Sequence, residues 1–206
     1  MANRFLTISM GMIVVAISTA ASADAPKYDF ADVLYQGIND SSGSGLSSDH
    51  AVGVDGSYAM TDKLIGLAAY AHETADYNQA GFSGTDSANS YSLGLGYRIP
   101  LTDRVDLMPN LAYLSEHVSA NLTGFNKSVS NSGYDAGVQL RAMITTQFEL
   151  DANIDHTTPG SPVNTVGVAA LYNFTSSFAV GLGYANQVSD GQTITGWTLA
   201  LRYYFK

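Results

Sequence analysis

The chain has 206 residues and carries 9 basic against 18 acidic side chains, a formal net charge of −9 at pH 7. This acidity leaves no basic footprint for phosphates and excludes a nucleic-acid partner. Thirteen tyrosines, eight phenylalanines and only 13% charged residues exclude a disordered chain, and the lack of cysteine excludes disulfides and a lipoprotein anchor.

The first residues have the pattern of an export signal. Arg4 precedes a short apolar run from Met10 to Ala16, and small residues follow up to Ala23. The run is too short to span a membrane as a helix, and an A-x-A pattern closes it. We therefore expect a signal peptide over residues 1–23 and one domain over residues 24–206.

Alternating apolar and polar residues fill the rest of the chain. No later stretch offers the ~20 uncharged apolar residues that a helical span needs, so membrane-spanning elements would have to be strands. The alternation predicts ten strands, with eight as the alternative. They are expected at residues 26–38, 49–60, 64–75, 89–99, 104–118, 132–143, 146–157, 163–174, 177–187 and 194–205.

The strand expected at residues 146–157 shows the alternation most clearly. Phe148, Leu150 and Ile154 share one face, and Glu149 and Asp151 share the other. A soluble β-sandwich also alternates, but its polar face is bathed in water and usually carries Lys and Thr. A charge that faces lipid near mid-membrane costs roughly 2 to 4 kcal/mol. We therefore expect apolar faces toward lipid and charged faces toward an enclosed interior.

Loop lengths and aromatic residues indicate the same architecture. Short turns alternate with longer connections rich in Ser, Gly and Asn, of which residues 76–88 and 120–131 are the longest. Aromatic side chains gather near the short turns, where an interfacial girdle is expected. They are Tyr97, Phe148, Tyr172, Phe174, Phe178, Tyr203 and Phe205.

The chain closes on "GWTLALRYYFK", in which every second residue from Trp197 to Phe205 is large and apolar. With the leader and the strand pattern over residues 24–206, the stretch "LALRYYF" resembles the small outer-membrane β-barrels of the OmpA and OmpX type. The resemblance implies an all-β, closed, antiparallel up-and-down barrel in the bacterial outer membrane, with short turns in the periplasm. The chain departs from these relatives by placing Lys206 after the terminal Phe and by having ten expected strands where they have eight.

The same resemblance implies partners. They are outer-membrane lipids and lipopolysaccharide around a monomeric barrel, and the barrel-assembly machinery, which would read the last strand. No cofactor is expected. The family includes adhesins, small pores, enzymes and passive anchors, so the resemblance leaves the function open.

Charged residues on the expected inner face form candidate pairs. Arg98 and Asp106 are equally spaced about Thr102, and Arg141 and Glu149 are likewise spaced about the next short turn. Positions symmetric about a hairpin turn lie directly opposite each other, with Cβ atoms about 5 Å apart. We therefore expect two cross-strand ion pairs near the short turns.

Closure of the barrel would bring Arg202, in the last strand, to Asp32 in the first. Together with further inward carboxylates, these pairs predict a charge network in the lumen, either structural or pore-lining. It comprises Asp32, Asp55, Arg98, Asp106, Glu116, Asp135, Arg141, Glu149, Asp151, Asp155 and Arg202.

The network allows two functions. A barrel of this size has an interior that side chains nearly fill, which favours a plugged lumen and a structural, surface-interaction or adhesion role for the outer loops. The alternative is a small cation-preferring channel, because Glu116, Asp135, Asp151 and Asp155 are expected to point inward without a base nearby.

Histidines raise a third alternative, a hydrolase acting on lipid or peptide, or a divalent-cation site at the rim. Each His adjoins an acid, as in Glu116–His117 and Asp155–His156. Omptins resemble this rim, but neighbours in a strand point to opposite faces, so each pair is split. His117 and Ser119 share a face as in the lipid A deacylases, yet the following strand offers no outward Glu to orient the imidazole. We therefore expect no enzyme, no catalytic residue and no metal site.

Overall fold

The computed structural model describes residues 25–40, 46–79, 82–122 and 125–205. The expected signal peptide lies outside the described residues. Eleven strands make up the described chain. They are β1 (Phe30–Asp40), β2 (Leu46–Ala59), β3 (Leu64–Gln79), β4 (Phe82–Tyr97), β5 (Ile99–Thr102), β6 (Val105–Leu122), β7 (Phe125–Met143), β8 (Phe148–Thr157), β9 (Val163–Asn173), β10 (Phe178–Ser189) and β11 (Gln192–Tyr204).

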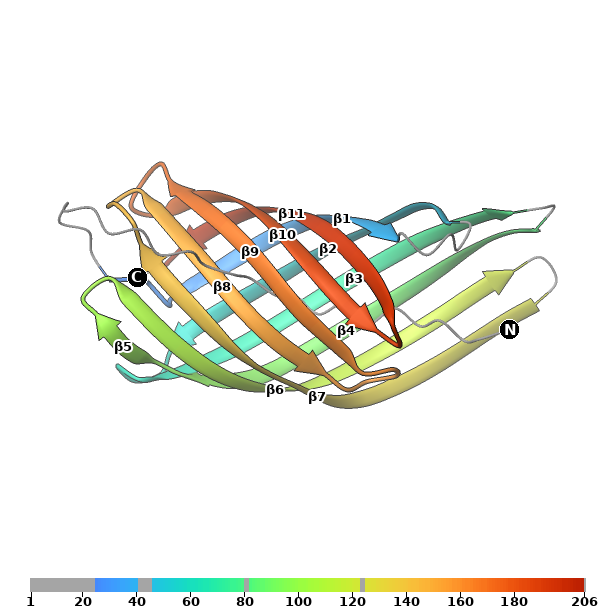
Figure 1. Cartoon of the computed structure of the whole chain (residues 1–206), viewed down its shortest axis with the longest axis horizontal. Coiled ribbons are helices and arrows are strands. Elements are labelled where there is room, and N and C mark those ends of the chain that lie inside the picture. Colours follow the sequence, from blue (N-terminus) through green and yellow to red (C-terminus); the bar gives the residue numbers. More distant parts are fainter. Residues whose placement is uncertain (1–24, 41–45, 80–81, 123–124, 206) are drawn as a thin grey trace.

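The strands close into the expected antiparallel barrel (Figure 1). The first strand, β1, pairs with both β2 and the last strand, β11. The short β5 follows β4 after Arg98, and both pair with β6, so they form one wall position and the barrel has ten. No helix in the described ranges is long and apolar enough to cross a membrane.

The two ends of the barrel differ. At one end, here called the turn end, short turns join β2 to β3, β5 to β6, β7 to β8 and β9 to β10. At the opposite hairpin end, β3, β4, β6 and β7 extend furthest from the barrel (Figure 1). The pairing of these strands continues outward to Asp76 with Thr85 and to Asn121 with Asn126.

The long connections expected at residues 76–88 and 120–131 are therefore mostly strand. Their Ser, Asn and Gly residues are typical of loops, but the backbone hydrogen bonds of a hairpin do not depend on the side chains. Once the hairpin is started in the barrel wall, each strand has a paired neighbour to extend along. The pairing of β4 with β6, which reaches Gly84 and Leu122, joins the two hairpins into one sheet.

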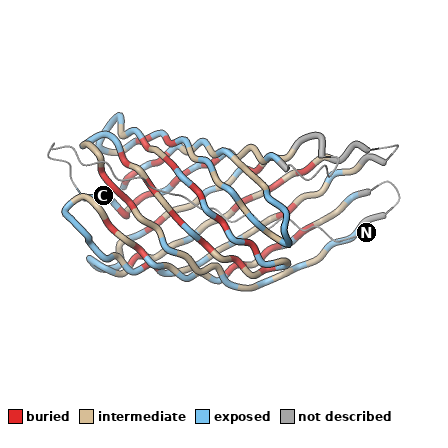
Figure 2. The backbone as a smooth tube through the Cα atoms, viewed as in Figure 1, coloured by how far each residue is buried: buried red, intermediate tan, exposed pale blue. Residues whose placement is uncertain are grey.

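Burial alternates along the barrel strands as expected (Figure 2). The outward side chains of Leu93 and Ile154 are 70% and 64% exposed, whereas the inward Asp151 and Arg141 are 0% and 1% exposed. An apolar exterior around a charged interior is the arrangement that a lipid bilayer requires. The seven aromatic residues expected near the turn end all point outward, with exposures between 38% and 48%.

Residues 26–29, expected as the start of a strand, instead lie across the turn end, where Tyr28 packs into the lumen while Lys27 stays exposed. Tyr28 is 5% exposed and packs with Ile65 and Met108. The Tyr28 carbonyl accepts a hydrogen bond from Ser57 Oγ, and Asp29 Oδ1 accepts one from the Ala59 amide at 3.0 Å. This inner segment partly fills the turn end of the lumen.

Candidate functional site

Arg202 and Asp32 join the first and last strands inside the lumen. They lie directly opposite each other in the pairing of β1 with β11. Arg202 Nε donates to Asp32 Oδ1 at 2.9 Å, and Arg202 Nη2 donates to Asp32 Oδ2 at 2.8 Å. Both residues are 1% exposed, and the guanidinium carbon lies 3.7 Å from the centre of the Phe30 ring. The pair therefore links the two strands where the barrel closes.

Arg141 connects the inner segment to two carboxylates of β8. Its Nε donates to Glu149 Oε1 at 2.7 Å and lies 3.6 Å from Asp151 Oδ1. Its Nη1 donates to the Lys27 carbonyl at 2.8 Å, and its guanidinium carbon lies 4.6 Å from the centre of the Tyr28 ring. Arg141 thus holds the inner segment in the lumen through both polar and cation–π contacts.

Arg98 and Asp106 complete the charged layer. Arg98 Nε donates to Asp106 Oδ2 at 2.7 Å, and the Tyr28 hydroxyl donates to the same oxygen at 3.2 Å. Asp106 is fully buried, whereas the Arg98 side chain is 23% exposed. We call the charged layer, together with Lys27 and Tyr28 of the inner segment and Phe30 of β1, the lumen plug: Lys27, Tyr28, Phe30, Asp32, Arg98, Asp106, Arg141, Glu149, Asp151 and Arg202.

The expected register of two ion pairs is wrong by two residues. Arg141 lies opposite Asp151, not Glu149, because the β7–β8 pairs are symmetric about Thr146 and not Thr145. Asp106 lies opposite Pro100 on one side and opposite Arg141 on the other. The Arg141–Glu149 and Arg98–Asp106 contacts form along a diagonal instead, which long side chains can reach.

Asp151 was expected to have no base nearby, and this expectation is also wrong. Its Oδ1 lies 3.6 Å from Arg141 Nε, and its Oδ2 lies 4.0 Å from Arg202 Nη1. Because the turn is centred one residue later than expected, Asp151 lies opposite Arg141 and belongs to the lumen plug. Asp55, opposite Asp32 in the β1–β2 pairing, is at the same level.

The remaining expected lumen residues, Glu116, Asp135 and Asp155, lie farther toward the hairpin end. Glu116 is 2% exposed and Asp155 is 6% exposed. Within the described chain, Glu116 Oε2, Asp135 Oδ1 and Asp155 Oδ2 have no hydrogen-bond partner. Among the described residues, the ion pairs of the plug join Arg98, Arg141 and Arg202 to other carboxylates than these three.

Sequence reasoning missed the lumen position of Tyr28, Phe30 and Glu73. Tyr28 and Phe30 alternate with polar neighbours, so they look like an ordinary strand. Glu73 was considered only with His72, although its inward parity in the third strand could have placed it in the lumen. It is 4% exposed.

His117 and His156 contact polar neighbours on the outer surface. His117 Nδ1 lies 2.8 Å from Ser130 Oγ, and His156 Nδ1 lies 2.9 Å from Asn164 Oδ1. Ser119 Oγ lies 3.5 Å from His117 Nε2, at the limit of a hydrogen bond. Across the described residues, no group of three or more His, Asp or Glu side chains is placed to hold a metal ion.

Residues 7–185 match the family model of the outer membrane protein β-barrel domain. The chain belongs to this family. Membership locates this outer membrane β-barrel protein in the bacterial outer membrane, and the closed barrel described above is the fold that the family name denotes. Among curated proteins, no sequence matches the chain significantly.

Solved structures share the fold at low identity. The KdgM porin in complex with disordered oligogalacturonate is 13% identical, with 85% of this chain and 99% of that chain covered and a TM-score of 0.50. Ail, the attachment invasion locus protein of Yersinia pestis, is 12% identical over 84% and 95% of the two chains, with a TM-score of 0.44. The outer membrane protease OmpT from Escherichia coli is 10% identical over 86% and 94%, with a TM-score of 0.49. The comparison with the KdgM porin, at a TM-score of 0.50, agrees with the barrel fold described above.

Proposed function

We propose that this outer membrane β-barrel protein is a plugged barrel with a structural and surface-interaction role, exerted by its outer hairpins. The observation that carries the proposal is the length of β3, β4, β6 and β7, whose pairing continues as one sheet out to Gly84 and Leu122. A barrel that only fills the membrane needs strands of about 9–11 residues, whereas these have 16 to 19. The extra length presents a surface outside the bilayer.

The lumen plug is the reason for preferring this role to a channel. Aromatic rings and ion pairs occupy the turn end, so an ion would have to displace buried, bonded groups to pass. A small cation-preferring channel remains the second candidate function, supported by the carboxylate oxygens of Glu116, Asp135 and Asp155 that lack a partner within the described chain. Hydrolysis has less support, because His117 pairs with Ser130 and not with a carboxylate.

The outer face of the extended sheet is polar and uncharged just above a row of tyrosines. Tyr91, Tyr113 and Tyr134 point outward with exposures of 56%, 60% and 50%, as expected of residues at a membrane interface. In the next positions outward, Asn89 lies opposite both His72 and His117. These three residues, here called the polar row (His72, Asn89 and His117), therefore offer imidazole and amide groups in place of apolar side chains.

Such a row suits the sugars of lipopolysaccharide, the lipid of the outer leaflet. Sugars present many hydroxyls, which amide and imidazole groups can bind as both donors and acceptors. In the proposal, the tyrosines lie at the acyl boundary and the polar row contacts the sugar layer. Export through the signal peptide at residues 1–23 and insertion by the barrel-assembly machinery belong to the same proposal.

Removal of the polar row should weaken lipopolysaccharide binding. In nanodiscs, the Asn89→Ala, His117→Ala double variant is expected to bind purified lipopolysaccharide about tenfold more weakly than the unmodified protein. Each lost neutral hydrogen bond contributes about 0.5–1.5 kcal/mol. Ser176→Ala, in an exposed turn at the opposite end, is the control and should bind as the unmodified protein does. Equal loss in the control, or no binding by the unmodified protein, would contradict the proposed contact.

A further inference from the structure

The lumen encloses a cavity of about 200 Å³ above the plug. Residues from all ten wall positions line it, so it is the central space of the barrel and not a groove between two strands. Phe30 and Arg202, both in the lumen plug, form part of its lining. A polar cavity of this size can hold several waters or a small organic ion.

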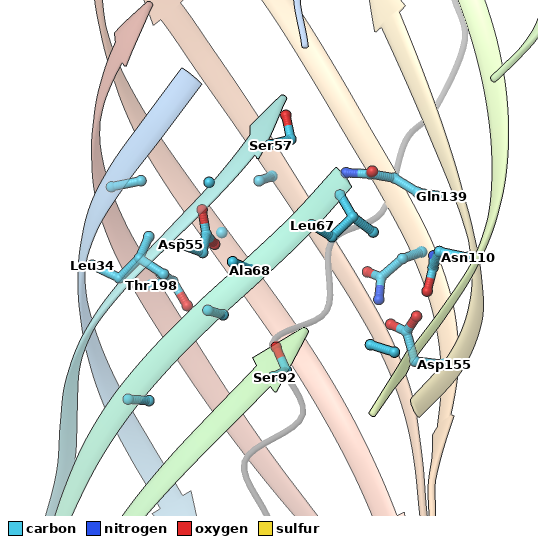
Figure 3. A pocket seen from close by; sticks show the side chains of 18 of the residues that line it. Leu34, Asp55, Ser57, Leu67, Ala68, Ser92, Asn110, Gln139, Asp155 and Thr198 are labelled. Atoms are coloured by element: carbon cyan, nitrogen blue, oxygen red, sulfur yellow. The ribbon is translucent and has the colours of Figure 1, made fainter. Parts of the chain in front are cut away.

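Three carboxylates line the cavity, on two walls. Asp55 belongs to β2, whereas Asp135 and Asp155 belong to the neighbouring strands β7 and β8. In the closed order of strands, four wall positions separate β2 from β8 in either direction, so the two walls face each other. Figure 3 shows Asp55 and Asp155 on opposite sides of the cavity.

The β8 wall also carries buried oxygens that lack a hydrogen-bond donor. Asp155 is 6% exposed and Asn153 is 5% exposed, and both line the cavity. Among the described residues, Asp155 Oδ2 and Asn153 Oδ1 have no hydrogen-bond partner. A buried polar atom left in this state costs about 1–3 kcal/mol, which a donor inside the cavity would recover.

The β2 wall holds surplus negative charge as well. Asp55 lies opposite Asp32, and the guanidinium of Arg202 is already bonded by both oxygens of Asp32. Arg202 and Arg141, the two guanidiniums that act on Asp55, are thus both bonded to other carboxylates, Arg202 to Asp32 and Arg141 to Glu149. A further cation placed beside Asp55 would balance the charge.

Between the two acidic walls the lining is mostly apolar, with a few neutral polar side chains such as Ser92 and Asn110. It includes Leu34, Leu67, Leu114 and Leu171, together with several alanines. A ligand that matches this pattern has a positive hydrogen-bond donor at each end and a hydrocarbon chain between. Toward the hairpin end, the buried carboxylates of Glu73 and Glu116 would attract such a cation along the lumen.

We propose that the cavity binds a linear alkyl diammonium ion, with one ammonium group at Asp55 and the other at Asp135, Asp155 and Asn153. The site lies inside the barrel and is independent of the outer polar row. Asn153 and Asp155 position one end by accepting hydrogen bonds, and the leucines pack against the methylene groups. The distance between the walls sets the preferred chain length.

Calorimetric titration of the refolded barrel with 1,3-diaminopropane, 1,4-diaminobutane, 1,5-diaminopentane and 1,6-diaminohexane tests the proposal. We expect the diamine of one chain length to bind most tightly. Butylamine, which has a single ammonium group, should bind at least tenfold more weakly than that diamine. Equal binding of butylamine and the best diamine would overturn the proposal. So would tighter binding of Mg²⁺, titrated alone, than of any diamine.

Two charge-neutralising variants locate the ends of the ligand. Asp55→Asn and Asp155→Asn keep the side-chain shape. Each should raise the Kd of the most tightly bound diamine at least tenfold. Asp62→Asn, in an exposed turn, is the matched control and should leave the affinity unchanged. The shift of the folded band in unheated gel electrophoresis shows that each variant is folded. Diamine binding that survives either lumen substitution would overturn the two-ended site.

Discussion

Replacement of Arg202 by alanine should destabilise the folded barrel by about 3 to 5 kcal/mol, because it leaves a buried carboxylate without its partner. Asp32 is 1% exposed and accepts three hydrogen bonds from Arg202. The pair also connects β1 to β11, so its loss weakens the place where the barrel closes. Urea unfolding in lipid vesicles, followed by the fluorescence of the single tryptophan, measures the change.

Two further variants make the Arg202 result specific. Arg98→Ala should lower the free energy of unfolding less than Arg202→Ala does, since the Arg98 side chain is 23% exposed and water can solvate part of the site. Adding Asp32→Asn to Arg202→Ala should recover part of the loss, because the remaining side chain is neutral. If Arg98→Ala costs as much as Arg202→Ala, burial of the closing pair is not what stabilises the barrel.

Charge reversal by Arg141→Glu should lower the free energy of unfolding even more, by several kcal/mol. The new carboxylate would face those of Glu149 and Asp151 in a buried site. Exchange of the two charges, with Arg141→Glu and Glu149→Arg together, should recover much of this loss. The exchange keeps the net charge and restores one opposite-charge contact along the same diagonal. The same urea titration compares the single and double variants.

The outcome of the exchange depends on the partner. An Arg141→Glu, Asp151→Arg variant tests the residue directly opposite in the pairing of β7 with β8. Recovery by either exchange supports a compact network around Arg141. Failure of both exchanges would mean that Arg141 acts through the inner segment, whose Lys27 carbonyl it also binds, and not through the carboxylates.

The barrel could be predicted from the sequence because alternation in a membrane strand has strict consequences. Asp151 and Ile154 fall on opposite faces, and a membrane tolerates only one assignment of those faces. The family resemblance and the strand count followed from the same pattern. The Arg202–Asp32 contact could be predicted since it depends only on closure of the first strand on the last.

The ion-pair register, the inner segment and the long hairpins could not be predicted, because they depend on features that alternation does not encode. A shift of one residue in the turn after β7 exchanged Glu149 for Asp151 opposite Arg141. The inner segment around Tyr28 alternates like a strand, yet its backbone bonds to Ser57 and Arg141 side chains inside the lumen. The long hairpins were missed because their polar composition is typical of loops, whereas the strand pairing at Asp76 and Thr85 is made by the backbone.

Single-channel conductance of the refolded residues 24–206 in a planar bilayer tests the plugged lumen most directly. The lumen plug predicts a folded protein that gives no steady conductance steps, in bilayers where a known open porin does. Steady, cation-selective steps that fall on Asp135→Asn and Asp155→Asn would contradict the plug and make the protein a small cation channel.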